Sequence, residues 1–232
     1  SDHISDLADL HLMTWINSTR TKPMDVYGPN GVESVINGFE DAYKLDYQFR
    51  NEHHGDEIAP INIAGFTPHT IDLNSSVIIN ENGLIVTAFQ VTHEPIEPAL
   101  GYRFEYGGRS IVISGDTSYS ENLIKNAQDA DVLFHEAQAN HQLEIMKEAL
   151  SSNKGLLKIL NDIESYHTTP IDAAKAANLA NVDHLIFYHL TPAPRIGVME
   201  RMFYRGVNEI RTDWTSANDG TMAVLPLDSD EI

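Results

Sequence analysis

Carboxylate and imidazole side chains occur at four distant points of this chain, each beside an apolar run. Asp2 and His3 belong to the opening Ser-Asp-His, His93 to Val-Thr-His-Glu, Asp116 to Ser-Gly-Asp-Thr and His189 to Phe-Tyr-His-Leu. In layered α/β folds, side chains at strand ends protrude into a crevice. Each residue alone is also explained by a structural histidine or a turn aspartate. Together they form a His and Asp set that predicts a metal site.

Three other patterns carry less chemistry. The run His53-His54-Gly55-Asp56 offers metal ligands, but adjacent side chains of a strand point to opposite faces, so we interpret it as a loop. The segment 28–31 (GPNG) lacks the Gly-Lys-Ser/Thr ending of a phosphate loop. Gly-x-Ser-x-Gly is also absent from the sequence, so a serine nucleophile has no support.

Composition limits the classes of function. The 232 residues include 15 Lys plus Arg against 34 Asp plus Glu, a formal charge of −19 that repels polyanions. There is no cysteine, so disulfides and thiolate metal sites are excluded. Apolar residues make up 42%, enough for a sizeable core, and no run approaches the ~20 apolar residues of a membrane span.

The pattern of apolar residues predicts hairpins first and alternating helices and strands later. We expect helices over 3–16, 32–45, 120–128, 138–151, 170–180 and 196–208. We expect strands over 24–27, 76–79, 84–89, 101–106, 110–114, 132–134, 185–188 and 222–225. Turn sequences at 80–83 (NENG) and 107–108 (GG) predict two hairpins. Such an order fits helices layered on a mixed sheet.

These motifs, in this order, resemble the metallo-β-lactamase superfamily. Its signature is His-x-His-x-Asp-His, then a single His, then the Asp of a Gly-Asp-Thr run, then a final His. The opening Ser-Asp-His is similar to the last three positions of the first motif. Further segments resemble the ribonuclease Z-like and arylsulfatase-like branch, namely 26–31, 108–117, 134–137 and 166–169. The resemblance extends over nearly the whole chain.

The resemblance implies an α/β fold, the αββα sandwich of the metallo-β-lactamase type, as one domain over residues 1–232 that lacks its N-terminal portion. It also implies two divalent metal ions, with Zn favoured and Mn or Fe as alternatives. Asp2, His3 and His189 would bind the second ion, His93 the first, and Asp116 would bridge both. The first motif's two upstream His are missing. We expect a longer polypeptide rather than a truncated protein, because a core without half its sandwich should not fold stably.

Two further residues are catalytic candidates through the same resemblance. In this branch, residues matching His167 and Glu136 lie near the metals and help to protonate the leaving oxygen, while Asp2 would orient the nucleophile. A Glu beside a His favours the charged imidazole that this step needs. The alternative is that His167 caps the helix beginning near Pro170 and Glu136 lies on the surface. We rank His135 below both as a site residue.

The resemblance predicts a metal-dependent hydrolase in which a metal-bridging hydroxide cleaves a small ester such as a phosphodiester or an aryl sulfate. One alternative is a ribonuclease Z-like nuclease that processes tRNA 3′ ends, and another is a non-catalytic metal-binding member of the fold. The charge and the interval of only 23 residues from His93 to Asp116 disfavour nucleic acid, because tRNA-gripping members carry a long arm there. We expect no membrane association, and relatives suggest a homodimer. The compartment stays open between the cytoplasm and export after removal of a signal.

Overall fold

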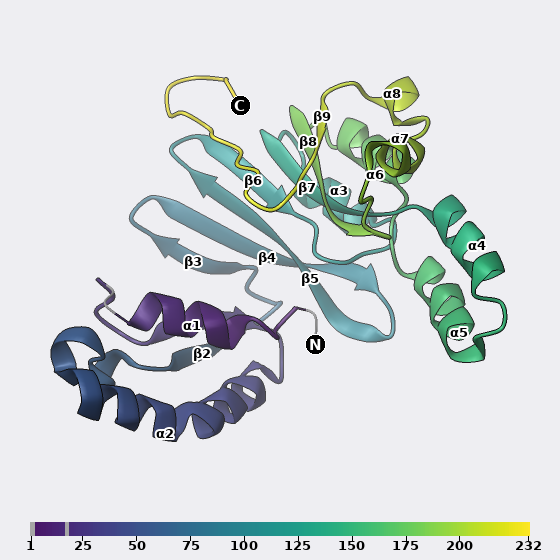
Figure 1. The fold of residues 1–232 in the computed structure, drawn as a ribbon. Helices are drawn as coiled ribbons and strands as arrows, with labels where there is room; N and C mark the ends of the chain where they lie inside the picture. The colour runs from purple at the N-terminus through teal and green to yellow at the C-terminus, as the bar shows by residue number, and fades with distance from the viewer. Residues whose placement is uncertain (1–2, 17–18) are drawn as a thin grey trace. The chain divides into compact units, whose positions relative to one another are not determined.

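The computed structural model describes residues 3–16 and 19–232 (Figure 1). It divides into two compact units, residues 1–72 and residues 73–232. Each unit has its own sheet and its own hydrophobic cluster. The single domain that we expect over residues 1–232 stays a prediction.

The N-terminal unit is built around a parallel pair of strands joined by a long helix. Its elements are α1 (Leu7–Trp15), β1 (Met24–Gly28), α2 (Val32–Ile58), the 3-10 helix η1 (Ile61–Ile63) and β2 (Phe66–Thr70). The strands pair in register from Met24 opposite Phe66 to Gly28 opposite Thr70. The buried cluster of this unit consists of Trp15, Tyr47, Ala59 and Ile63.

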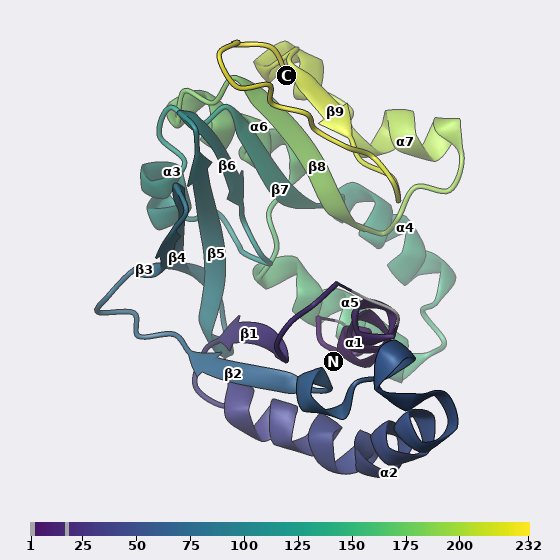
Figure 2. The ribbon, with the colours of Figure 1, turned by 90° about the vertical axis from the view of Figure 1, so that its left-hand side faces the viewer.

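The C-terminal unit contains a seven-stranded sheet whose spatial order follows the chain (Figure 2). The strands are β3 (Val77–Glu81), β4 (Leu84–His93), β5 (Ile96–Tyr106), β6 (Arg109–Ile113), β7 (Val132–Gln138), β8 (His184–Thr191) and β9 (Trp214–Ser216). Pairs from β3 to β6 are antiparallel, and pairs from β6 to β9 are parallel. Consequently β6, β7 and β8 end at the same edge of the sheet.

The helices of this unit lie in the connections that follow β6, β7 and β8. They are α3 (Glu121–Asn126), α4 (Asn140–Ala149), α5 (Lys154–Asp162), the 3-10 helix η2 (Ile163–Ser165), α6 (Pro170–Leu179), α7 (Gly197–Phe203) and α8 (Val207–Ile210). The face of α6 that packs on the sheet consists of alanines, of which Ala173, Ala174 and Ala177 are fully buried. Small side chains allow α6 to lie close to β7 and β8, and this fixes where its N-terminal end stands.

Both predicted hairpins are confirmed. Asn82 and Gly83 take positive φ angles in the turn between β3 and β4, and Gly107 and Gly108 do so between β5 and β6. Asn and Gly tolerate this backbone region better than other residues, which is why the turns could be located from the sequence.

Four predictions about elements need correction. The helix expected to end at 45 continues as α2 to Ile58, because no Gly or Pro interrupts residues 39–54. The run from His53 to Asp56 is therefore part of α2 rather than a loop, with a non-helical Gly55, and the rings of His53 and His54 stack 4.5 Å apart. The helix expected over 196–208 is divided into α7 and α8 at Gly206, whose φ is +88°.

The strand expected over 222–225 is also wrong, since these residues pair with no strand. Instead the guanidinium of Arg109 donates hydrogen bonds to the carbonyls of Pro226, Ser229 and Glu231, so the tail is fastened by a side chain. Among the described residues, the structure contains no helix that combines the length and the apolar character needed to cross a membrane.

Candidate metal centre

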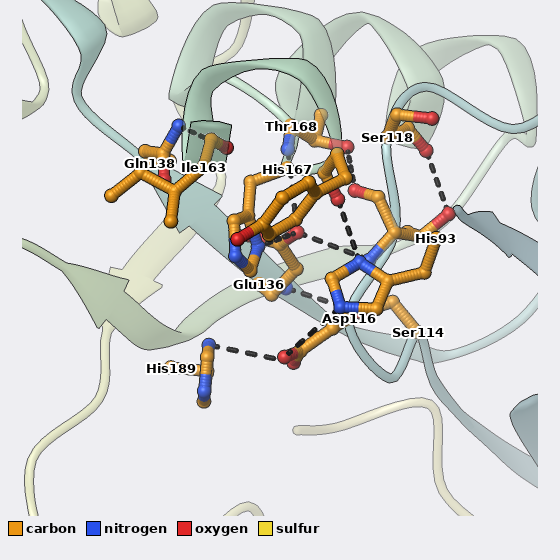
Figure 3. Close-up of polar contacts among 12 residues, drawn as sticks. His93, Ser114, Asp116, Ser118, Glu136, Gln138, Ile163, His167, Thr168 and His189 are labelled. Carbon is orange, nitrogen blue, oxygen red and sulfur yellow. Dashed lines mark hydrogen bonds and ion pairs between the residues drawn. The ribbon is translucent and has the colours of Figure 1, made fainter. Parts of the chain in front are cut away.

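Five polar side chains of the C-terminal unit converge beyond the ends of its strands (Figure 3). His93 ends β4 and Asp116 follows β6. Glu136 lies near the end of β7, and His189 lies near the end of β8. His167 lies in the loop that leads into α6. The sequence-predicted candidates from this unit are therefore brought together.

Asp116 stands at the centre of the group. Its Oδ2 lies 4.0 Å from Nε2 of His93, and its Oδ1 lies 3.4 Å from Nδ1 of His189. The turn that delivers it requires Gly115, whose φ is +64° and where a Cβ would collide with the carbonyl oxygen of Leu100. One carboxylate thus faces imidazoles from two different strands, and its role as a bridging ligand stays a prediction.

The imidazole of His93 is oriented by a hydrogen bond to a backbone carbonyl. Its Nδ1 donates to the carbonyl oxygen of Tyr166 at 2.8 Å, because a carbonyl can only accept. The Tyr166 ring stands edge-on to the imidazole, with centroids 4.9 Å apart. The lone pair therefore lies on Nε2, the atom that faces Asp116. A fixed tautomer of this kind is typical of metal-binding histidines.

His189 sits at an irregularity of the sheet. Glu136 pairs with Tyr188 and Ala137 pairs with Leu190, so His189 is an extra residue in β8. Its φ is +46°, an uncommon conformation for a residue with a side chain. Bulges re-aim side chains next to functional sites, and strained backbone concentrates there. The bulge turns the imidazole toward Asp116.

Glu136 and His167 form a buried pair behind these residues. The Glu136 side chain is fully buried, and its Oε1 accepts hydrogen bonds from Nδ1 of His167 at 2.8 Å and from the backbone N–H groups of Thr117 and Thr168 at 3.1 and 3.3 Å. The alternative of a surface glutamate is wrong. A capping role for His167 is also excluded, because the side chain of Thr169 caps α6 by accepting from the N–H of Asp172.

The lower rank of His135 agrees with its position. His135 is buried, and its Nδ1 donates to the carbonyl oxygen of Glu136 at 2.7 Å. It alternates with Glu136 along β7, so its side chain leaves the strand on the opposite face. Burial lowers the pKa of His135, which favours a neutral structural histidine.

Several residues that sequence reasoning did not single out hold the site together. The Oγ1 of Thr168 donates to the carbonyl of Thr117 at 2.6 Å, and the Oγ1 of Thr117 accepts from the N–H of Thr92 at 3.1 Å. Burial raises the pKa of Tyr188 to about 12, against the opposing effect of its hydrogen bond with Ser114. Thr117 directly follows Asp116, so the sequence could have indicated its role. The roles of Thr168 and Tyr188 depend on tertiary contacts.

The donor atoms fit divalent metal ions. His93, Asp116 and His167 offer ligand atoms within 4.8 Å of one another, and Glu136, His167 and His189 form a second such group. Imidazole nitrogens and carboxylate oxygens without sulfur suit Zn, Mn or Fe. Asp2 lies outside the described residues. His3 belongs to the N-terminal unit, and the ligand roles of both stay predictions.

Nitrogen and oxygen donors gathered at the strand ends of a mixed sheet define an α/β protein with a candidate metal site. A family model described as the beta-lactamase superfamily domain matches residues 1–190. The chain belongs to this superfamily, and its fold is the metallo-β-lactamase fold.

Comparisons with individual proteins agree with this assignment. A ribonuclease Z from Mycolicibacterium gilvum is 27% identical over 199 residues, which cover 85% of this chain and 65% of the relative. Among solved structures, the metallo-beta-lactamase fold protein YhfI from Bacillus subtilis matches with a TM-score of 0.56 and 16% identity, over 93% of this chain and 70% of that protein. The short form of human tRNase Z matches with a TM-score of 0.52 and 21% identity, over 79% of this chain and 66% of that protein. The chain thus spans about two thirds of the length of this ribonuclease Z.

Proposed function

We propose that this protein is a metal-dependent hydrolase that cleaves small esters such as phosphodiesters or aryl sulfates. The observation that carries the proposal is the buried Glu136–His167 pair beside His93, Asp116 and His189. Membership of the superfamily supports hydrolysis as the reaction type. Divalent ions, when bound, lower the pKa of coordinated water and polarise the ester oxygen.

The side chains of this chain then have distinct tasks. His93, Asp116 and His189 would hold the ions, and Asp116 faces both imidazoles. His167 gives a proton to the leaving oxygen, because hydrolysis produces an alkoxide or phenoxide that must be neutralised. Glu136 stabilises the protonated imidazole by accepting from its Nδ1, which leaves Nε2 as the donor to the leaving group.

The interval from His93 to Asp116 supports a small substrate over tRNA. It contains β5, β6 and two short connections, so the chain has no segment there that could form a long arm. The formal charge of −19 also opposes binding to a polyanion. The relative named ribonuclease Z favours tRNA processing as the second candidate, at 27% identity.

The test uses the intact protein. Bound metal is measured first, and then aryl sulfate, bis-aryl phosphodiester, lactone, β-lactam and precursor tRNA substrates are assayed in parallel. We expect turnover of a small ester that falls about 100-fold or more in His167→Ala. With two ions bound per chain, inactivity on every small ester would overturn the proposal, and cleavage of precursor tRNA alone would favour the second candidate. Less than one ion per chain would favour a non-catalytic member.

A further inference from the structure

A cavity opens beside His189. Its volume is about 450 Å³, a size that suits a small organic group. It is formed by β8, the loop after β8, α7 and the segment that follows β9, all within the C-terminal unit. The lining residues are Tyr188, His189, Leu190, Ala193, Pro194, Glu200, Ser216, Ala217, Asn218 and Asp219.

The carboxylates that line this cavity make it negatively charged. Glu200 and Asp219 contribute two carboxylates, and the described residues that line the cavity include no Lys or Arg. Glu200 also acts on its surroundings, since its charge adds to burial in raising the pKa of Tyr204 to about 12. Tyr204 in turn donates to Oγ of Ser216 at 2.8 Å and so fixes one wall of the cavity.

Besides the two carboxylates, the cavity lining offers the hydroxyl of Ser216 and the amide of Asn218, set in an apolar frame. Leu190, Ala193, Pro194 and Ala217 supply that frame. An anionic substituent placed here would face both carboxylates, whereas a cationic one would be attracted by them. Glu200 and Asp219 are exposed, so salt screens this preference and its size is modest.

We infer that this cavity receives the non-reacting half of the substrate and selects an ester whose substituent carries a positive charge, such as an aminoalkyl or trimethylammonioethyl group. The inference rests on the proposed ester hydrolysis at the adjoining metal centre. His189 is shared between the two sites, so a substituent in the cavity lies next to the ligand group that contains Asp116.

The experiment compares three p-nitrophenyl phosphodiesters that differ only in the second alcohol. These alcohols are choline, its neutral isostere 3,3-dimethylbutanol and an anionic 3-carboxypropanol. We expect kcat/KM for the choline ester to exceed that for the neutral ester by about tenfold at low salt, with the anionic ester slowest. Glu200→Gln and Asp219→Asn each lower the cation-to-neutral ratio about threefold, and raising the salt concentration does the same in the unmodified protein.

Glu148→Gln is the matched control, because Glu148 is exposed on α4 and does not line the cavity. This variant should keep the unmodified ratio. A ratio near one, or a preference for the anionic ester, with all three esters hydrolysed would overturn the inference while leaving the ester hydrolase intact. If no ester is hydrolysed, the proposed function fails, and calorimetric binding of choline against 3,3-dimethylbutanol decides the inference separately. Equal binding of the two alcohols would then reject it.

Discussion

At the scale of single residues, the candidate site depends on polar and ionisable side chains that are buried. Glu136 is fully buried, and the Asp116 and His167 side chains are nine-tenths buried. Burying a charged group is costly unless hydrogen bonds compensate it. Three donors on one oxygen of Glu136 provide this compensation. A buried acid held in this way acts on His167, the one ionisable partner among the three donors.

The first prediction concerns Glu136→Gln. The amide keeps the shape of the side chain but loses the charge that stabilises protonated His167, so we expect kcat to fall about 100-fold on esters with alkyl leaving groups. Esters of p-nitrophenol need little protonation and should lose much less. Steady-state assays with both substrate types measure the difference, and Glu148→Gln is the control. Equal losses on both leaving groups would indicate a purely structural role for Glu136.

The second prediction concerns Asp116→Asn. An uncharged amide is a poorer ligand for a divalent ion than a carboxylate, so we expect metal affinity to fall by more than about 100-fold. Competition with a chromophoric chelator measures this affinity. Asp183→Asn, at an exposed position of the same unit, should leave metal binding unchanged. Unaltered affinity in Asp116→Asn would remove Asp116 from the ligand set.

At the scale of elements, local signals in the sequence predicted what local chemistry determines. Turn residues located both hairpins, and apolar runs located β6, β7 and β8. His93, Asp116 and His189 were assigned to strand ends and lie there, while their roles as metal ligands stay predictions. Other features depend on tertiary context. The bulge at His189 leaves no sequence signal, and the exposed Met222 and Val224 of the C-terminal tail resemble a strand although no partner is available.

The third prediction concerns the turn that delivers Asp116. Gly115 and Gly108 both have positive φ angles, +64° and +82°. A Cβ at Gly108 would meet nothing within 4 Å, whereas one at Gly115 would strike the Leu100 carbonyl. We therefore expect Gly108→Ala to cost about 1 kcal/mol of unfolding free energy and Gly115→Ala to cost at least about 2 kcal/mol more. Urea unfolding measures both, and equal costs would contradict the collision.

At the scale of the whole molecule, two compact units share one chain and a strongly negative charge. The units differ in their buried titratable groups. In the C-terminal unit, the buried side chains of Glu136, Asp116 and His167 belong to the candidate metal centre. In the N-terminal unit, His11 is buried among Trp15, Tyr47 and Phe66, and its Nε2 accepts from the N–H of Gly65 at 3.4 Å. Acid should therefore act on the two units separately.

The last prediction is that the N-terminal unit loses stability as pH falls from about 6.5 to about 4. Burial, with a smaller effect of nearby Arg20, lowers the pKa of His11 from 6.5 to about 4. Between pH 6.5 and about 4, His11 takes up a proton in the unfolded chain but stays neutral in the folded protein. The stability is therefore complete above pH 6.5 and declines through the window, by about 3 kcal/mol at most.

The two tryptophans report on the two units separately, because Trp15 stacks on His11 with ring centroids 5.7 Å apart and Trp214 lies in β9. Urea unfolding of Trp214→Phe, followed by Trp15 fluorescence at several pH values, measures the decline in the N-terminal unit. His11→Gln keeps a hydrogen-bond acceptor that does not titrate, so the part of the pH dependence due to His11 should vanish in this background. If the variant and its parent decline in parallel from pH 6.5 to 4, other groups cause the loss, because only a proton taken up by His11 distinguishes the two proteins.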